Sequence, residues 1–474
     1  MARSLLAGSL VVLLGMGTVA CSDDTKPPPS GTGGTMNTGS TSASGAAGGG
    51  GQGGTGGMVT TTSAGGAGGV GGSGGVGPGG AGGIGGAGGI GGAGGAGGAG
   101  GAGGAPPPMD QDGNGWTPAD GDCCDDPALC SAPELVNPGA FEYLGNLLDD
   151  DCDPATLDDT PVADCAGMAL DLPTSSLELI KALDLCQFTN ENAPLPVRKW
   201  GVISNAYLTA DGGMAQLPSN VQVGVLDGYG TQVTPRKGGT MAALSSGTAR
   251  DLDDPGHIYP QNGPMVGQLG NFDAGTQTSA PPEYLAAHGG TLPSSPACPP
   301  CVGDNCDQSF DSVNLKARIR VPTNALSFSY NFKFYSAEFP EFLCNEYNDF
   351  FVTLLTSSEP TIPVDKNIAF DANDNAVSVN NAFFQVCFPP MNSLPGTCPA
   401  GTLELAGTGM GGWGANNKDG GGTVWLTNDS PVIPGETMEI EFIIWDSGDP
   451  NVDSLVLLDA FRWKVTPSEV GVHE

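Results

Sequence analysis

The second half of the chain alternates between short apolar runs and turn-forming residues. The runs are rich in β-branched and aromatic residues and are separated by Pro, Gly, Asn and Asp, which predicts strands joined by turns. Because no helical pattern alternates with these runs, a mainly β fold is expected, with one large β-sandwich or jelly-roll-like domain. The predicted strands are Ala317–Val321, Leu326–Phe334, Phe350–Leu355, Ala382–Phe388, Thr423–Thr427 and Met438–Ile444.

One short helix is predicted at the N-terminal side of this domain. Ser175 and Glu178 have the spacing of a capping box, in which each residue satisfies a backbone N–H of the first turn. The apolar residues that follow fall on one helical face. They are Leu179, Ile180, Leu183 and Leu185.

The first half of the chain has a different composition. Residues 27–108 have hardly a charged or aromatic residue, and Gly-Gly-Ala and Gly-Gly-Ile units repeat through Gly66–Ala105. Such a segment cannot bury enough apolar area to offset the entropy lost on ordering, so we expect a disordered tether. Collagen is excluded because in this repeat Gly often occurs in pairs and Pro is nearly absent.

The first twenty residues are typical of an export signal. Arg3 is followed by an apolar run from Leu5 to Val19, which is short for a membrane span. The run ends in Thr18-Val19-Ala20-Cys21-Ser22, which resembles a bacterial lipobox. The resemblance implies cleavage before Cys21, acylation of Cys21 and, because Ser22 is not Asp, an outer-membrane, cell-surface location. The alternative is an ordinary secretory signal with an incidental Cys21.

The expected divisions are a signal peptide at 1–20, the lipidated Cys and tether at 21–108, an acidic unit at 109–160 and the sandwich domain at 161–470.

Charge and cysteine content support export. The formal net charge is −35, so binding to nucleic acid through backbone charge is not expected. Of 13 cysteines, Cys21 leaves an even twelve, compatible with complete pairing in an oxidising compartment. Cys298-Pro-Pro-Cys301 could hold zinc, but only three His occur in the chain and disulfides are favoured.

The segment from Asp110 to Asp153 carries the first candidate metal site. Asp110, Asp112 and Asn114 have the spacing of the first half of an EF-hand loop, and Gly115 permits the sharp turn that brings hard oxygens onto Ca²⁺. The twelfth position is Gly121 instead of Glu, so Asp120 or Asp122 has to supply the last carboxylate. The predicted calcium ligands are Asp110, Asp112, Asn114, Trp116, Asp120 and Asp122. A solvated acidic loop held by disulfides is the alternative.

The same segment resembles the MopE-type metal-binding motif of bacterial surface proteins. Four blocks appear in the family's order: Asp110–Gly115, Gly121–Asp126, Asn137–Glu142 and Asp149–Asp153. The resemblance implies a metal-binding unit, and the family name suggests copper. The hard oxygen donors of this chain favour Ca²⁺ instead.

Residues 175–466 resemble the bacterial choice-of-anchor L domain. The resemblance rests on the Gly-rich Gly238–Gly247, the strand and acids of Leu326–Phe342, Tyr347–Phe351, and Pro434-Gly435-Glu436 leading into Trp445–Asp449. It implies an extracellular β-sandwich and names no partner.

Acids follow the predicted strands of this domain. Acids beside an apolar core are costly to bury unless a cation or hydrogen-bond donors compensate. One interpretation is a second Ca²⁺ at Asn348, Asp349, Asp446 and Asp449. The other is that these side chains cap turns by accepting backbone N–H groups.

The function expected from these patterns is calcium-binding adhesion or recognition at the cell surface, without catalytic activity. The membrane is contacted through lipid on Cys21, and the partner is an extracellular protein or glycan. A structural envelope protein is the alternative, and a glycoside hydrolase with paired carboxylates is a weaker one. Trp413, Trp425, Trp445 and Trp463 could form a sugar-stacking surface or be core residues.

Overall fold

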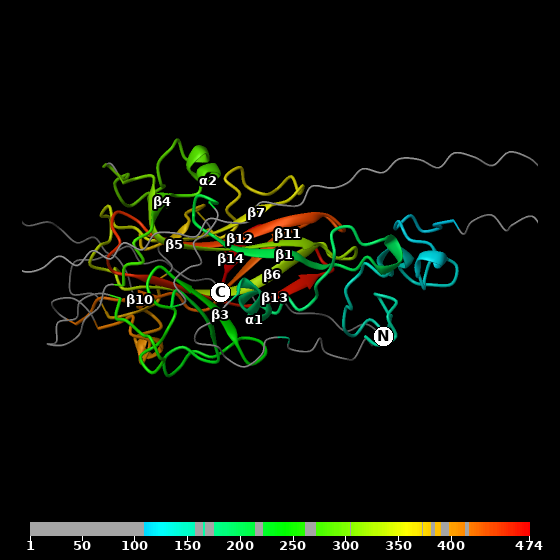
Figure 1. The fold of residues 1–474 in the computed structure, drawn as a ribbon, viewed down its shortest axis with the longest axis horizontal. Helices are drawn as coiled ribbons and strands as arrows, with labels where there is room; N and C mark the ends of the chain where they lie inside the picture. Colours follow the sequence, from blue (N-terminus) through cyan, green and yellow to red (C-terminus); the bar gives the residue numbers. More distant parts are fainter. Residues whose placement is uncertain are drawn as a thin grey trace, which may run out of the picture. The chain divides into compact units, whose positions relative to one another are not determined.

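The fold is a two-layered antiparallel β-sandwich. The computed structural model describes residues 109–156, 165, 175–213, 221–260, 272–303, 305–371, 373–380, 384–389, 398–412 and 417–474. The signal segment, Cys21, the Gly-rich segment and Trp413 lie outside these residues. Figure 1 shows the strands of the sandwich together with the acidic segment that precedes them.

The first sheet has six strands in the order β1-β5-β12-β7-β8, with β4 beside β5. Its long central strands β5 and β12 pair in antiparallel register, with Leu315 opposite Phe442 and Ala317 opposite Ile440. The bounds are β1 Gly201–Leu208, β4 Gln277–Ser279, β5 Gln308–Arg320, β7 Phe350–Thr356, β8 Val377–Ser378 and β12 Thr437–Asp446.

The second sheet has eight strands in the order β14-β11-β6-β13-β3-β2, with β10 joining β6 to β9. β6 and β13 form its centre, with Phe332 opposite Leu458 and Phe334 opposite Val456. The bounds are β2 Val223–Leu226, β3 Met241–Ser245, β6 Ser327–Ser336, β9 Val386–Cys387, β10 Gly421–Gly422, β11 Leu426–Pro431, β13 Ser454–Lys464 and β14 Gly471–His473.

The core lies between the inner faces of the two sheets. Phe332 meets Phe351 with ring centroids 5.3 Å apart, and Tyr330 meets Phe442 edge-to-face at 5.1 Å. The Tyr330 hydroxyl donates to Thr353 Oγ1 at 2.6 Å, so the one polar atom of this contact is satisfied inside the core. Aromatic pairs of this kind add about 0.5–1.5 kcal/mol each beyond the area that they bury.

Loops and a helix cover the outer faces as well. Trp445 on β12 is fully buried and stacks on Phe350 at 5.2 Å, in a cluster that includes Tyr284 of α2 (Pro282–Ala287). Trp463 is also buried, and Trp425 packs partly buried against a second outer cluster. Of the tryptophans considered for a sugar surface, those that the structure describes are therefore mostly core residues.

The mainly β prediction is confirmed, and the predicted helix is present. α1 spans Ser176–Ala182, and the Ser175 N–H donates to Glu178 Oε2 at 3.0 Å, as a capping box requires. The sequence pattern did not predict α2 or the buried β13. The short 3₁₀ turns are η1 Pro118–Asp120, η2 Pro133–Leu135, η3 Leu195–Val197 and η4 Leu403–Leu405.

Three predicted strands differ clearly in their bounds. The run 317–321 covers only the end of β5, which begins at Gln308. The run 382–388 contains only the two residues of β9, and part of it lies outside the described residues. The run 423–427 becomes β11, which begins at Leu426 and continues to Pro431. The side-chain hydroxyl of Thr423 accepts the Phe334 N–H at 3.0 Å, and this contact replaces the regular ladder before Leu426.

Six disulfides connect the described cysteines, which confirms the prediction of structural pairing. Cys298 and Cys301 bond to different partners, so their Cys-x-x-Cys spacing is not a redox or zinc pair. The bonds are Cys123–Cys152, Cys124–Cys130, Cys165–Cys186, Cys298–Cys344, Cys301–Cys306 and Cys387–Cys398.

Among the residues that the structure describes, no helix has the length and apolar character needed to cross a membrane.

Candidate metal sites

The half-loop predicted from the sequence brings three carboxylates together. Asp110, Asp112 and Asp125 each place a carboxylate oxygen within 4.8 Å of the others. Asp110 accepts the N–H groups of Gly113 at 2.7 Å and Gly115 at 3.0 Å, which holds the tight turn. Burial and the neighbouring acids Asp122 and Asp110 raise the pKa of Asp112. The group has the charge and the oxygen donors of a hard-cation site.

The remaining predicted ligands of this loop have other partners. Asn114 donates from Nδ2 to Asp112 Oδ2 at 3.0 Å and to Asp122 Oδ2 at 3.1 Å, so Asn114 and Asp122 lie next to the carboxylate group. Asp120 accepts the Thr117 hydroxyl at 2.7 Å, and the Trp116 indole donates to the Leu195 carbonyl at 3.3 Å. Asp125 thus stands in the group with Asp110 and Asp112, where the spacing had pointed to Asp120 or Asp122.

A second carboxylate group lies in the same acidic unit and was not predicted as a site. Glu142, Asp149 and Asp151 also bring their oxygens within 4.8 Å of one another. Glu142 Oε1 and Asp149 Oδ1 are buried and have no hydrogen-bond partner. Burial, followed by the charges of Asp150 and Asp151, raises the pKa of Glu142 to about 7. A cation here would satisfy oxygens that the protein leaves unpaired.

The signal for this second group was present in the sequence. Glu142 closes the Asn137–Glu142 block and Asp149 opens the acidic block that ends at Asp153. The backbone turn 143–148 folds these blocks onto each other, and Asp150 holds that turn by accepting the Tyr143 N–H at 2.9 Å. The spacing of about seven residues does not resemble a familiar calcium loop, which explains why the pattern alone did not identify it.

The acidic unit contacts the sandwich through specific hydrogen bonds. Thr323, between β5 and β6, donates its N–H to the Gly139 carbonyl at 3.0 Å. Asn324 accepts the Phe141 N–H at 2.9 Å and donates to the Phe141 carbonyl at 2.8 Å. Lys199 pairs with Asp153 at 2.9 Å. The loop that carries Glu142 is therefore held against the sandwich on its N-terminal side, at Gly139 and Phe141.

This contact predicts the effect of Gly139→Ala. A Cβ at Gly139 would lie 2.8 Å from the Trp116 ring and 3.0 Å from the Thr323 methyl group. Overpacking of this kind costs about 1–3 kcal/mol, so chemical denaturation should show a destabilised acidic unit. Gly471→Ala is the matched control, because a Cβ there meets nothing within 4 Å. Equal stability of the two variants would show that the contact carries no packing constraint.

An aromatic groove lies beside Glu142. It has a volume of about 260 Å³ and is lined by both the acidic unit and the sandwich. Trp200 and Trp463 form an edge-to-face pair at 6.2 Å, and Phe141 and Tyr143 form another at 6.5 Å. Tyr143 is 43% exposed, so part of the aromatic surface faces solvent. Lys237 and Arg462 add positive charge to this lining.

Of the four residues predicted as a site in the sandwich, only Asp349 and Asp446 lie side by side. Trp445 lies opposite Phe350 in the antiparallel β12–β7 pair, which places Asp446 across from Asp349. Both are fully buried, and Asp349 accepts the Ser454 hydroxyl at 2.6 Å and the Ser447 N–H at 3.2 Å. These two predicted residues therefore come together at one end of the sandwich.

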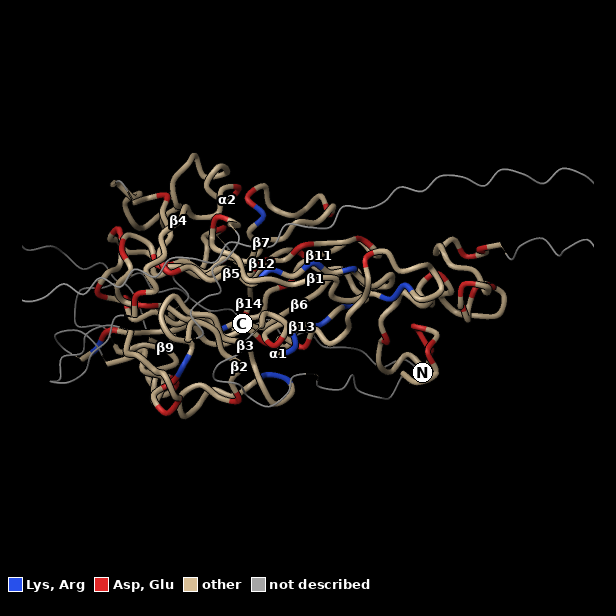
Figure 2. The backbone as a smooth tube through the Cα atoms, viewed as in Figure 1, with Lys and Arg blue, Asp and Glu red and all other residues tan. Residues whose placement is uncertain are grey.

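The other two predicted residues accept backbone N–H groups, Asn348 from a distant segment and Asp449 within its own turn. Asn348 accepts the Asn380 N–H at 2.8 Å. Asp449 accepts the Asn451 N–H at 2.9 Å and lines a surface pocket. Figure 2 shows acids along many loops of the molecule, so position in a loop alone does not separate caps from cation ligands.

Comparison with known proteins finds one family model that matches part of the sandwich. Residues 302–462 match the family model of the choice-of-anchor L domain. The match runs from the approach to β5 into β13, so it covers the central strands of both sheets. It indicates a bacterial cell-surface protein. No curated protein and no solved structure matches the chain.

Proposed function

We propose that this chain is a lipid-anchored surface protein whose acidic unit binds Ca²⁺ and thereby positions a recognition groove. The observation that carries the proposal is the group Glu142, Asp149 and Asp151, in which three carboxylate oxygens meet and two are buried without a partner. The anchor is the acylated Cys21. The partner is an extracellular glycan or protein, and the module performs no catalysis.

Calcium and recognition are linked through Glu142. Phe141 and Tyr143, its chain neighbours, line the aromatic groove, as Glu142 does. A cation between Glu142 and Asp149 fixes the loop from both ends and lowers the entropy lost when a ligand binds. Aromatic rings with an exposed face suit stacking on sugar rings or on a peptide side chain.

Isothermal titration of the full chain with Ca²⁺ tests the metal site. Glu142→Gln removes one charge and one ligand, so the affinity of one binding event should fall at least about tenfold, or ~1.4 kcal/mol. Glu134→Gln is the matched control, since Glu134 belongs to the same unit and is exposed. Equal affinities for the two variants would refute a site at Glu142.

Arrays of glycans and of extracellular matrix proteins test the recognition role. Binding should occur with Ca²⁺, disappear with EDTA and be weakened by Trp200→Ala. Binding that is unchanged by EDTA would remove the link between metal and groove. Release of sugars from a bound polysaccharide would favour the hydrolase alternative instead.

A further inference from the structure

Four acidic residues from both sheets lie at one end of the sandwich, close enough for their charges to act on one another. Asp349 precedes β7 and Asp446 ends β12, in the first sheet. In the second sheet Ser454 lies opposite Ser336, which places Asp453, just before β13, beside the segment that follows β6. The Ala337 N–H donates to the Asp453 carbonyl at 3.2 Å, and Glu338 is the next residue. The four acids are distant in sequence, and the pairing of the strands brings them to the same end of the sandwich.

These carboxylates are buried and mostly lack hydrogen-bond donors. Asp446 and Asp453 are completely buried and Glu338 is 2% exposed. Both carboxylate oxygens of Asp446, both of Asp453 and Glu338 Oε2 have no hydrogen-bond partner. No ion pair among the described residues includes any of the four acids. The Ser246 hydroxyl acts on Asp446 and the Asp349 N–H acts on Glu338, but no positively charged group among the described residues forms an ion pair with these acids.

Asp459 shows what a compensated buried acid looks like in the same sandwich. It is completely buried too, but its carboxylate accepts the backbone N–H groups of Arg236, Lys237 and Ala460. Backbone N–H groups therefore satisfy the carboxylate of Asp459, which serves as a structural hydrogen-bond acceptor. At the sandwich end the fold supplies such donors to Asp349 and leaves Asp446 and Asp453 open.

Four carboxylates can be buried together only if protons or a cation neutralise their negative charge. An ionised carboxylate loses several kcal/mol of hydration on burial, even after relaxation of the protein. Burial and the neighbouring acids raise the pKa of Asp349 to about 7 and those of Glu338, Asp446 and Asp453 well above the usual range. A divalent cation would replace the protons and accept the lone pairs of hard oxygens directly.

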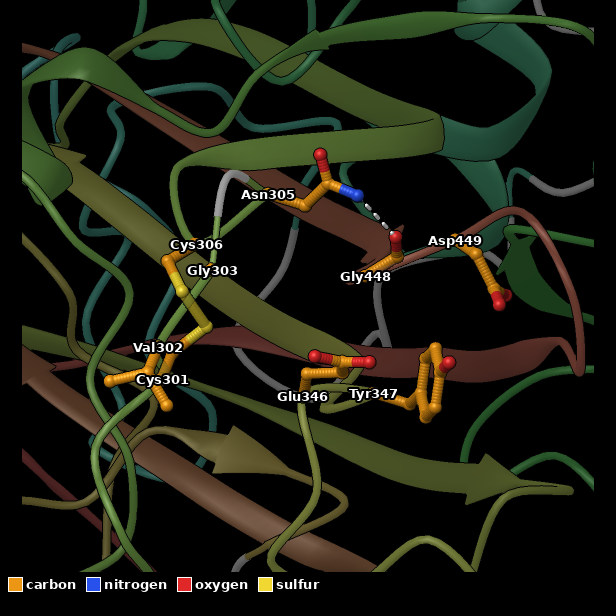
Figure 3. A pocket seen from close by; sticks show the side chains of 9 residues that line it. All are labelled: Cys301, Val302, Gly303, Asn305, Cys306, Glu346, Tyr347, Gly448 and Asp449. Atoms are coloured by element: carbon orange, nitrogen blue, oxygen red, sulfur yellow. Dashed lines mark hydrogen bonds between the residues drawn. A yellow bond between two sulfur atoms is a disulfide. The ribbon is translucent and has the colours of Figure 1, made fainter.

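A surface pocket lies near this group. Its volume is about 200 Å³, and Tyr347, Gly448 and Asp449 contribute to its lining. Figure 3 shows the Asn305 amide donating to the Gly448 carbonyl, at 2.8 Å, and the Cys301–Cys306 disulfide on the pocket wall. Glu346 and Asp449 add negative charge, and the charge of Asp449 reaches both Glu338 and Asp349. A pocket with this charge concentrates cations near the buried group.

We propose that Glu338, Asp349, Asp446 and Asp453 bind a second divalent cation, of the Ca²⁺ class, which joins the two sheets. In the described part of the chain only the groups in the acidic unit bring three carboxylate oxygens within 4.8 Å. The four sandwich acids do not bring three oxygens within that distance, so the proposed binding requires their side chains to change rotamer. The site stands independently of the acidic unit and of the recognition role proposed above.

Calcium stoichiometry and thermal melting of the full, oxidised chain test the proposal, with CaCl₂ and EDTA as the two conditions. Asp446→Asn keeps the shape of the side chain and removes one negative charge. It should bind one Ca²⁺ fewer than the unmodified chain and lose part of the calcium-dependent rise in Tm. In EDTA it should melt higher than the unmodified chain, because repulsion among the buried acids is relieved.

Two variants make the result specific. Asp459→Asn should lower Tm in both conditions and leave the stoichiometry unchanged, as expected for a buried structural acceptor. Glu142→Gln should affect only the binding event of the acidic unit, so failure of that site and failure of this one are distinguishable. An Asp446→Asn chain with full stoichiometry and an undiminished calcium-dependent rise in Tm would overturn the proposal, and would leave protons as the counter-charge.

Discussion

In EDTA the protein will melt at a higher temperature at pH 5 than at pH 7.5. Burial raises the pKa of Asp349, Glu142, Asp419 and Asp459 to about 7 in the fold. In the unfolded chain these groups titrate near 4. Between about pH 4 and pH 7 the native state therefore holds more protons than the unfolded state, so stability falls as pH rises. The usual acid denaturation of proteins has the opposite sign in this range.

The expected difference in Tm is about 5 °C or more, since one pKa unit corresponds to ~1.4 kcal/mol and several groups contribute. Differential scanning calorimetry at both pH values measures it. The net charge of −35 also disfavours the compact state at higher pH, so the scans need a control at high ionic strength. About 0.5 M NaCl screens exposed charges within a few ångströms and leaves buried groups little affected.

Calcium should reverse this dependence. A cation that binds the ionised carboxylates of the fold competes with protons, so its stabilising effect grows as pH rises. With Ca²⁺ the Tm at pH 7.5 should equal or exceed that at pH 5. A Tm that rises with pH in EDTA at high salt would show that the buried acids are ionised and compensated in some other way.

Removal of the Cys123–Cys152 disulfide should abolish most calcium affinity of the acidic unit. The bond joins residues 29 apart, and a loop of this length contributes about 3–4 kcal/mol in the loop-entropy model. The unit buries few apolar side chains, among them Trp116, Val136 and Ala140, so its own core cannot replace that contribution. If folding has to accompany binding, each ~1.4 kcal/mol lost lowers the affinity tenfold.

The Cys123→Ser, Cys152→Ser double variant should therefore bind Ca²⁺ at the acidic unit about a hundredfold more weakly in a titration. The matched control is Cys387→Ser, Cys398→Ser, which removes a bond of the sandwich between residues 11 apart. That variant should lose some thermal stability and keep the calcium affinity of the acidic unit. Undiminished affinity in the first variant would mean that contacts with the sandwich alone hold the acidic unit in its binding conformation.

The sequence predicted the sandwich because its central strands carry their own signal. Phe350–Leu355 and Met438–Ile444 are dense in β-branched and aromatic residues, and β7 and β12 follow them closely. β13 was missed although nearly all of it is buried. Its outer face is covered by loops, so Ser454–Lys464 lacks the alternation of a strand with one solvent-exposed face.

The candidate sites were predictable only where ligands are close in sequence. Asp110 and Asp112 are two residues apart, and local turn geometry brings them together. Asp349 and Asp446 were grouped because both flank predicted strands, and the β12–β7 register then places them side by side. Glu338 and Asp453 belong to the other sheet, and no spacing rule relates residues of two sheets before the register is known.

The hydrogen bonds between Phe141 and Asn324 also define a path for mechanical force. Chain order places the acidic unit between the Gly-rich segment and the sandwich, so tension from the anchor proposed at Cys21 would reach the acidic unit before the sandwich. It then crosses the covalent Cys123–Cys152 loop and reaches the sandwich in part through the Gly139–Thr323, Phe141–Asn324 and Lys199–Asp153 contacts. The cation proposed at Glu142 would lie on this path, so external calcium would then set the load at which the module yields when the proposed partner is pulled away.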